Sequence, residues 1–491
     1  MAPAFAFSAQ SLPPGRDWLA LVAGLAARPG FWWLDSALPQ STPPGSADAA
    51  LRGRFSFAGA EPWCVLRVRG EQIGLEERCA RPELARASGA GDVFGALRAL
   101  LPGRGARIAC GDAEPAPLPF VGGLVAAIGY ELGAWIERVP AARDDTPLPL
   151  ADAYALGVDR LYAFDHAAAR VYAVALCAAD TERAALAAAR EAGHALAQAA
   201  PRAALPTLAP TRSRAPRVPR RGLDAQEHAK LVESIRERIA AGDLYQACLT
   251  QRIDAEFLGD PFAYYCALRA ESPAPFGAFL ALPEGAVACS SPERFLRCGA
   301  DGSLETRPIK GTRGRRAEAG ADRAEAAALL ASEKDRAENL MIVDLARNDL
   351  GRVSALGSVH VPTLFTLESY AQVHQLVSTV RGRLAAGRDA LDAVRAAFPP
   401  GSMTGAPKVA AMQLLAGLER ARRGLYAGAL GYLDARGGCD LAVVIRSAFF
   451  ANGRIAVHTG GGIVADSEPR AEWDEAESKA AALLDVAARA G

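Results

Sequence analysis

The chain has 491 residues, of which 51% are hydrophobic and 22% are charged. These values allow a large core and, by length alone, two to three domains. Lysine plus arginine and aspartate plus glutamate both number 55, so the formal net charge is zero. Because no excess of positive charge is present, we expect neither a nucleic-acid partner nor attraction to an anionic membrane.

Neither the start of the chain nor any internal stretch predicts export or membrane insertion. No run of about twenty apolar residues occurs, and Met1 to Phe5 lacks the basic and then apolar order of a secretion signal. The nine cysteines are scattered and form no C-x-x-C pair. Neither a disulfide framework nor a thiolate zinc site is therefore indicated. We expect a cytoplasmic protein with reduced cysteines.

Short apolar runs between turn signals fill the N-terminal part of the chain. Phe31 to Leu34 and Val65 to Val68 are two of them, and they predict strands of a mostly antiparallel sheet. Leu161 to His166 followed by Arg170 to Val174 predicts a hairpin. The alanine-rich stretch from Thr181 to Ala199 predicts a helix. An N-terminal region of residues 1–205 follows from this pattern.

The composition changes after this helix. Residues 206–222 are rich in proline and arginine and have no apolar period, which predicts an exposed linker. Asp224 and Glu227 then form a capping box, and apolar residues recur every four positions until Gly242, which predicts an amphipathic helix. We therefore place a second region at residues 223–491.

A basic stretch from Thr306 to Gly314 lies after a predicted strand meander. Pro308 fixes φ, and Gly311 and Gly314 allow sharp backbone paths, so we expect Lys310 at the apex of a tight loop. A lysine that rigid apolar neighbours shield from water becomes a nucleophile or a base. The ordinary alternative is a solvated lysine beside two arginines.

Two helical stretches offer carboxylates on one face. Asp335 and Glu338 share a helical period, and Glu472, Glu475 and Lys479 repeat the arrangement near the C-terminus. Paired carboxylates without nearby histidine or thiol ligands suit a hard cation such as Mg²⁺. Salt-bridged, solvated helix faces remain the ordinary alternative.

An apolar run from Leu441 to Phe450 predicts a buried strand that carries one arginine, Arg446. A buried guanidinium needs a carboxylate, either from the protein or from a ligand. The next predicted strand, Ile455 to Thr459, leads into Gly460 to Gly462, whose amides can approach an anion closely. Gly401 to Lys408 looks like a phosphate loop but lacks that motif's second glycine and lysine.

Six ordered segments between residues 225 and 480 together resemble the chorismate-utilising enzymes. They are Pro292 to Phe295, Pro308 to Thr312, Glu338 to Asp349, Gly401 to Lys408, Tyr432 to Arg446 and Glu472 to Lys479. Residues before 200 resemble, more weakly, the N-terminal part of the synthases of aminodeoxychorismate and anthranilate. The resemblance implies an α+β fold in which two large antiparallel sheets, built jointly by both halves of the chain, pack as a sandwich with helices outside.

The resemblance also implies how chorismate is held and transformed. Mg²⁺ would bind Glu338 and Glu475 with help from Glu472, while the substrate carboxylates would meet Arg446 and its companions. The implied substrate-binding residues are Gln246, Gly311, Thr312, Thr404, Tyr432, Arg446, Gly460, Gly461, Gly462 and Lys479.

Three positions, Gln246, Lys310 and Glu293, imply which reaction takes place. Gln246 stands where the isochorismate synthases have a lysine base that activates water, which favours ammonia as the nucleophile. Lys310 is typical of component I of the aminodeoxychorismate synthases and is expected to act as a covalent nucleophile, with Glu293 as the general acid. The implied product is 4-amino-4-deoxychorismate, a precursor of para-aminobenzoate and folate.

The sequence also predicts a partner subunit and a second ligand site. No cysteine nucleophile in a small-residue elbow is evident, so a separate glutaminase subunit would supply ammonia. The family likeness also implies a possible tryptophan site at Ser36 and at Pro275 to Gly277. Cys248 and Gln375 depart from the family pattern, which has asparagine and histidine there. Anthranilate synthase component I and a non-catalytic, chorismate-binding paralogue are the alternatives.

Overall fold

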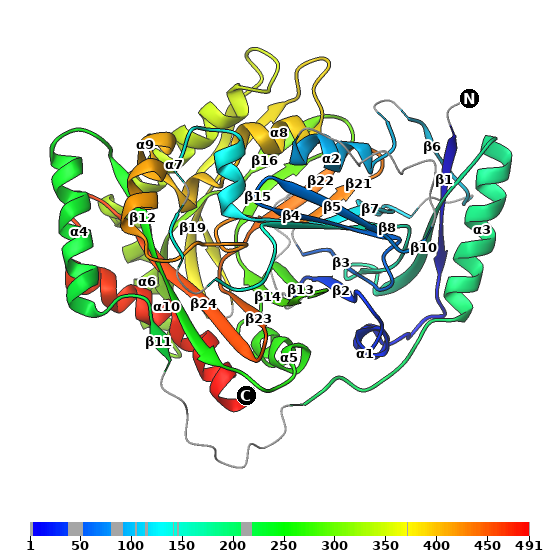
Figure 1. Cartoon of the computed structure of the whole chain (residues 1–491), viewed down its shortest axis with the longest axis horizontal. Helices are drawn as coiled ribbons and strands as arrows, with labels where there is room; N and C mark the ends of the chain where they lie inside the picture. Colours follow the sequence, from blue (N-terminus) through cyan, green and yellow to red (C-terminus); the bar gives the residue numbers. More distant parts are fainter. Residues whose placement is uncertain are drawn as a thin grey trace.

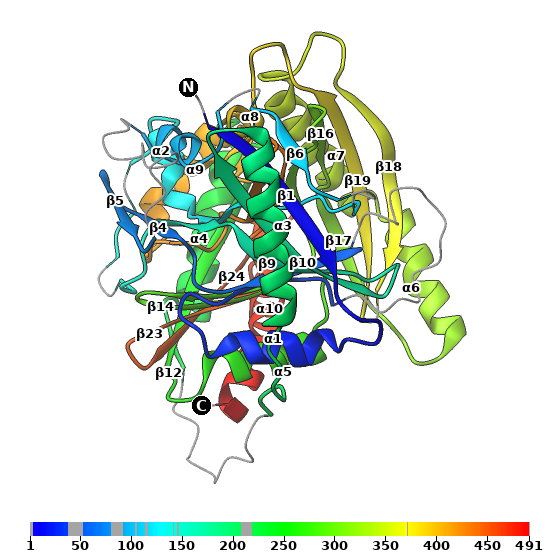
Figure 2. The same cartoon turned by 90° about the vertical axis from the view of Figure 1, so that its right-hand side faces the viewer.

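The computed structural model describes residues 3–37, 53–79, 92–103, 106–112, 116–140, 142–144, 147–207, 219–370 and 372–490. Two large β-sheets form its centre, and helices lie on the outside (Figure 1). Figure 2, turned by 90°, shows α3 lying along β1 and β10 at one end of the molecule. The fold is therefore the expected α+β sandwich.

The first sheet has 13 strands. Every pairing in it is antiparallel except that of β1 with β6. In spatial order the strands are β11 (Arg220–Arg221), β12 (Gln246–Glu256), β24 (Arg454–Ile463), β23 (Ser447–Ala451), β14 (Gly285–Ser291), β13 (Phe276–Leu282), β2 (Trp32–Asp35), β3 (Phe55–Gly59), β9 (Arg160–Asp165), β10 (Arg170–Ala179), β1 (Ala4–Ser11) and β6 (Ile108–Cys110), with β20 (Gly405–Ala406) beside β12.

The second sheet has 11 strands. In spatial order they are β17 (Ile309–Gly314), β19 (Val373–Arg383), β16 (Ser303–Thr306), β15 (Arg294–Cys298), β22 (Cys439–Val443), β21 (Ala429–Asp434), β7 (Gly123–Ile128), β8 (Ala153–Val158), β4 (Cys64–Arg69) and β5 (Gln72–Glu77), with β18 (His360–Ser369) beside β19. Strands from both sides of residues 206–222 take part in each sheet. The boundaries 1–205, 206–222 and 223–491 stay a prediction, and residues 208–218 lie outside the described part.

The helices begin where the sequence offers a cap. Asp224 and Glu227 form the predicted capping box of α4, and Thr181 accepts a hydrogen bond at the start of α3. The α-helices are α1 (Trp18–Ala26), α2 (Val93–Ala99), α3 (Glu182–Gln198), α4 (Ala225–Ala240), α5 (Pro261–Glu271), α6 (Ala319–Ala331), α7 (Glu333–Gly351), α8 (Ala390–Ala397), α9 (Lys408–Leu418) and α10 (Pro469–Ala490), and the short 3₁₀ helices are η1 (Tyr130–Trp135) and η2 (Gly401–Met403).

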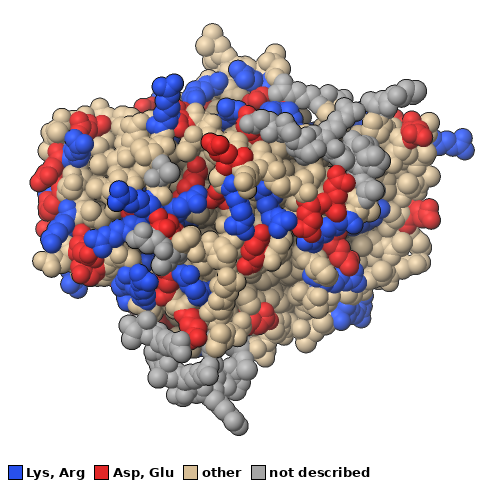
Figure 3. All heavy atoms as spheres, in the orientation of Figure 1, with Lys and Arg blue, Asp and Glu red and all other residues tan. Residues whose placement is uncertain are grey.

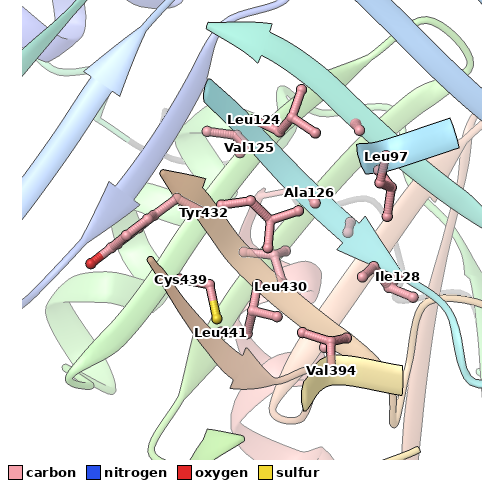
Figure 4. Close-up of a cluster of buried hydrophobic side chains, with 14 of the residues drawn as sticks. Leu97, Leu124, Val125, Ala126, Ile128, Val394, Leu430, Tyr432, Cys439 and Leu441 are labelled. Atoms are coloured by element: carbon pink, nitrogen blue, oxygen red, sulfur yellow. The ribbon is translucent and has the colours of Figure 1, made fainter. Parts of the chain in front are cut away.

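One buried apolar cluster joins both sheets and their covering helices. Figure 4 shows part of it, where Leu430 and Leu441 of neighbouring strands lie close to Val394 of α8, and Ile128 of β7 lies near Leu97 of α2. Burying one such aliphatic side chain contributes about 1.5–3 kcal/mol. The cluster therefore fixes how the two sheets face each other.

Two predicted segments are corrected by the structure. The apolar run from Leu441 to Phe450 is not one strand, because β22 ends at Val443 in the second sheet and β23 begins at Ser447 in the first. Arg446 lies at this crossing with φ +51°. Lys310 lies within strand β17 rather than at a loop apex, and the register of β17 against β19 shifts between Ile309 and Thr312.

Basic and acidic side chains are intermixed over the face that Figure 3 shows. Opposite charges lie next to one another there, as expected from equal totals of 55 basic and 55 acidic residues. None of the described helices is long and apolar enough to cross a membrane.

Candidate active site

The glycine run at the end of β24 forms one wall of the candidate site. A Cβ atom at Gly462 would lie 2.5 Å from Gln246 Nε2 and 3.1 Å from Lys310 Nζ. A Cβ atom at Gly461 would lie 3.1 Å from Glu472 Oε2. The absence of side chains on this stretch therefore leaves room where an amide, an amine and a carboxylate approach one another.

The same stretch has backbone groups available for a ligand. Gly460 to Gly462 pair with β12 on one edge. On the other edge, β23 pairs with β24 only as far as Ala448 opposite Val457. Because the chain leaves this sheet at Arg446, the second edge of the glycine run has no strand beside it in the described part of the chain. Amides on an unpaired edge can bind an anion.

Arg446 is half-buried; its backbone carbonyl accepts the Ser290 N–H at 3.1 Å, but its guanidinium has no hydrogen bond or ion pair to any described residue. Burial lowers the pKa of its guanidinium, while the nearby Tyr426 and Glu475 act in the opposite direction. A guanidinium removed from water without a carboxylate partner favours binding of an anionic ligand. The sequence left open whether a carboxylate of the protein or of a ligand pairs with Arg446. Among the described residues no carboxylate does so, which favours a ligand.

Lys310 lies at the centre of the charged groups of the site. Its positive charge lowers the pKa of three carboxyl groups, those of Glu293, Glu338 and Glu475. Gly311, which follows it, has φ +81°, and a Cβ atom there would meet the Asp335 side chain at 2.9 Å. Only glycine therefore fits the register shift that presents Lys310.

Glu293 is 6% exposed and lies near Lys310 and Ser402. Burial raises the pKa of its carboxyl to about 7, although the nearby Ser402 hydroxyl and the charge of Lys310 act to lower it. A carboxyl group with a pKa near neutrality can donate a proton at physiological pH. Sequence reasoning missed Ser402, because nothing in the chain indicates that residues 109 positions apart meet.

Carboxylates of α7 and α10 face the same region. Burial raises the pKa of Glu338, and the negative charge of Glu472 raises it further. Glu472 is buried and accepts a hydrogen bond from Ser467 Oγ at 2.6 Å. Lys479 Nζ contacts Glu475 Oε1 at 2.7 Å and donates to the Gly460 carbonyl at 2.9 Å.

These carboxylates suit a hard cation that keeps most of its water ligands rather than a cation coordinated entirely by protein side chains. Among the described residues, no three His, Cys, Asp or Glu side chains are close enough together to hold a metal ion. Mg²⁺ commonly keeps several waters and uses one or two protein carboxylates. The mutual repulsion of Glu338 and Glu472 is the kind of unbalanced negative charge that such a cation offsets.

Two other predicted substrate-binding residues, Thr312 and Thr404, have places that do not point directly to a role in binding. Thr312 is exposed at the end of the β17 register shift. Thr404 is fully buried, and its hydroxyl donates to the Gly401 carbonyl at 3.2 Å, so it holds its own loop together. Its carbonyl accepts the Cys248 amide hydrogen at 2.8 Å, which attaches that loop to β12.

The structure does not bring Tyr432 to this group. Its ring stacks on Phe120 at 4.8 Å and lines a separate pocket with Phe276. A different tyrosine, Tyr426, is buried near Arg446 and stacks on His458 at 5.0 Å. Sequence reasoning missed Tyr426, although the small residues Ala427 and Gly428 that follow it signal a close backbone approach.

The residues of the possible tryptophan site gather around that separate pocket. Pro275, Phe276 and Gly277 line it with Leu34 and Asp35. Ser36 is buried beside them in the chain, its backbone N–H donates to Ser56 Oγ at 2.9 Å, and its own hydroxyl has no partner. Whether a ligand binds there stays a prediction.

The two departures from the family pattern lie in strands. Cys248 is buried in β12, and its backbone carbonyl accepts a hydrogen bond from Arg423 at 2.8 Å. Gln375 is buried in β19 and its Oε1 has no partner. Neighbouring His374 is bound to Ser369 and Asp322, so it does not replace the missing histidine.

Comparison with known proteins identifies the family. A family model described as chorismate binding enzyme matches residues 96–485, most of the chain. The chain belongs to this family. It is 42% identical over 473 residues to an aminodeoxychorismate synthase of Streptomyces pristinaespiralis, covering 95% of this chain and 63% of that protein. The chain thus spans less than two thirds of the length of that relative.

Two further family members extend the comparison. Aminodeoxychorismate synthase component 1 of Escherichia coli (strain K12) is 37% identical over 433 residues, which cover 88% of this chain and 89% of that protein. The crystal structure of anthranilate synthase component I from Streptococcus pneumoniae superposes with a TM-score of 0.71 at 29% identity, covering 90% of this chain and 94% of that one. The chain thus shares its fold with that anthranilate synthase component I, and the names of the proteins that it resembles cover more than one reaction.

Proposed function

We propose that the chain is the chorismate-aminating subunit of an aminodeoxychorismate synthase, and that it converts chorismate and ammonia to 4-amino-4-deoxychorismate. The observation that carries the proposal is the position of Lys310. Its amine and the Gln246 amide both lie within 3.1 Å of where a Gly462 Cβ would be, and its charge acts on the buried Glu293. A nucleophile and a general acid thus border the same space.

In this proposal the substrate is held by its two carboxylates. Arg446 has no carboxylate partner in the described protein, and the free edge of Gly460 to Gly462 offers amides. Glu338 and Glu475 would hold Mg²⁺ together with water molecules, assisted by the negative charge of Glu472, and the ion would supply positive charge to a substrate carboxylate. Lys479 keeps Glu475 in place through its contact at 2.7 Å.

The chemistry is two successive displacements. Once its amine has given up a proton, Lys310 uses the nitrogen lone pair to form a bond to ring carbon 2 while the hydroxyl group at carbon 4 leaves, and Glu293 gives that leaving oxygen its proton. Ammonia then bonds to carbon 4, and Lys310 leaves carbon 2 with its electron pair. A proton returns to Glu293 as the ammonium product is neutralised, so the protein ends as it began.

Gln246 supports ammonia rather than water as the second nucleophile. Its side-chain amide is fully buried, and neither its oxygen nor its nitrogen has a hydrogen-bond partner. An amide cannot remove a proton from water as an amine base does. Ammonia needs no such activation, because its lone pair is already available.

The test is to incubate the purified chain with chorismate, MgCl₂ and ammonium chloride and to measure product mass and pyruvate. We expect 4-amino-4-deoxychorismate without pyruvate. Anthranilate together with pyruvate would instead assign the chain to the reaction named for the Streptococcus pneumoniae structure. Binding of chorismate without any product would indicate a non-catalytic paralogue.

A further inference from the structure

A cavity separate from the candidate active site lies between η1 and α9. Its volume is about 780 Å³, and Leu132, Trp135 and Met412 form part of an apolar wall. Figure 1 shows the cyan segment that contains η1 beside the orange helix α9, and Gln413 of α9 donates to the Arg138 carbonyl at 2.9 Å. The space is large enough for an organic molecule.

Two polar side chains of this cavity lack partners. Tyr130 is 9% exposed, and its hydroxyl has no hydrogen-bond partner among the residues that the structure describes. Glu131 accepts the Arg423 backbone N–H at 2.7 Å through one carboxylate oxygen, whereas the other oxygen is buried without a partner. Buried polar atoms without partners are costly, so both favour a ligand that donates hydrogen bonds.

The charges around the cavity favour a cation. Four carboxylates and two guanidinium groups line it, those of Glu71, Glu131, Asp152, Glu419, Arg422 and Arg423. Arg422 is paired with Asp152 at 2.7 Å, and Arg423 with Glu419 at 2.7 Å. Asp152 and Glu419 are thus paired with arginines, and Glu71 is exposed. Glu131 remains as the partly buried carboxylate of the lining that forms no ion pair with a described side chain. Burial raises the pKa of its carboxyl to about 7, opposed by the charge of Arg422 and aided by that of Asp152.

We propose that this cavity is a second binding site, which takes a protonated amine with its charged group on Glu131 and Tyr130. The amine is either the ammonium ion itself or an organic amine whose apolar part lies against Trp135 and Met412. The cavity also lies close to strand β12, which carries Gln246 of the candidate active site. The Arg423 guanidinium covers the Tyr130 ring at 4.1 Å and donates to the Cys248 carbonyl, so one layer of side chains separates the cavity from β12.

The test measures binding to the full chain by isothermal titration calorimetry. The probes are phenethylamine, its neutral analogue 2-phenylethanol, and ammonium chloride as a competitor. We expect phenethylamine to bind at least tenfold more tightly than 2-phenylethanol. Displacement of phenethylamine by millimolar ammonium chloride would assign the site to ammonium, and its failure to displace would assign the site to organic amines.

Matched variants locate the site. Glu131→Gln keeps the side-chain size and removes the charge, so phenethylamine binding should weaken at least tenfold, whereas Glu71→Gln at the exposed rim should change it less than twofold. Binding to wild type should tighten about tenfold from pH 6 to pH 8 as Glu131 ionises, and Glu131→Gln should lose this dependence. If Glu131→Gln does not fold, Ala416→Phe, which fills the cavity, serves in its place. Equal binding of the amine and the alcohol, or unchanged binding in both variants, would overturn the proposal. Neither outcome depends on turnover of chorismate.

Discussion

At the scale of single residues, Lys310 and Glu293 carry the proposed chemistry. The type of each residue was readable from the sequence, but the environment of each was not. Burial of Glu293 depends on strands from distant parts of the chain, and Ser402, which lies near it, is far along the sequence. A raised carboxyl pKa is a property of the folded surroundings, so sequence reasoning could name the residue and not its pKa.

Replacement of Lys310 by alanine is expected to abolish the first displacement, because no covalent intermediate can form. We predict a loss of about a hundredfold or more in aminodeoxychorismate formation with chorismate binding retained. This loss does not depend on any direct addition of ammonia at carbon 2, because the assay measures the product that is aminated at carbon 4. Mass spectrometry of wild type quenched with chorismate, without ammonia, should show an adduct on Lys310, and near-normal turnover by Lys310→Ala would refute the covalent role.

A pH dependence follows from the pKa of about 7 at Glu293. A general acid acts in its protonated form, so kcat/KM should be full below pH 7 and fall as the pH rises through it. Glu293→Gln should lower kcat about a hundredfold or more and remove this alkaline limb. A wild-type profile that is flat from pH 6 to pH 8.5 would argue against the assignment.

The stability of the fold should respond to the same group. The folded pKa lies above the ordinary value of 4.5, so the folded state holds this proton more tightly than the unfolded state. The contribution is therefore fully present below about pH 4.5 and is lost as the pH rises through about 7. Glu293→Gln should be at least as stable as wild type at pH 8 in urea unfolding, which separates lost catalysis from lost folding.

At the scale of elements, two helices bring their carboxylates from different layers. Helix α7 packs against β17 and β19 of the second sheet, whereas α10 packs against β24 of the first. The period of the acidic residues predicted each face, but not that the two faces meet. The break between β22 and β23 at Arg446 could not be predicted from the sequence either. An apolar run that passes from one sheet to the other has the same residue pattern as one continuous strand.

Neutralising either helix should weaken the proposed Mg²⁺ site. Glu338→Gln and Glu475→Gln each remove one negative charge and keep the side-chain size, so each should raise the Mg²⁺ concentration for half-maximal activity at least tenfold. Asp344→Asn on the exposed face of α7 is the matched control and should leave it unchanged. Wild-type activity of both variants at limiting Mg²⁺ would contradict the assignment of Glu338 and Glu475 to the Mg²⁺ site.

At the scale of the whole molecule, each sheet contains strands from both sides of residues 206–222. The apolar runs predicted most strands, whereas their spatial order came only with the family resemblance. A fragment of residues 223–491 alone would expose the apolar edges of β13 and β21. We therefore predict that this fragment is insoluble when expressed alone, and that co-expression with residues 1–205 restores folding, as measured by circular dichroism and chorismate binding. A fragment that folds alone would contradict the prediction.

The partner is a further prediction at this scale. If a separate glutaminase supplies ammonia, the isolated chain should turn over chorismate with ammonium chloride and not with glutamine. Turnover with glutamine by the isolated chain, measured as glutamate release, would show that no partner is needed.

The crossing at Arg446 has a mechanical consequence. A ligand held at once by Arg446, by the glycine amides of β24 and, through Mg²⁺, by the carboxylates of α7 would link one β-sheet of the sandwich to the other. The stabilisation of the folded state would grow with ligand concentration, because a ligand that binds only the folded state stabilises it by RT ln(1 + [L]/Kd). Chorismate would then slow hydrogen exchange in strands of both sheets at once, including strands that it never touches.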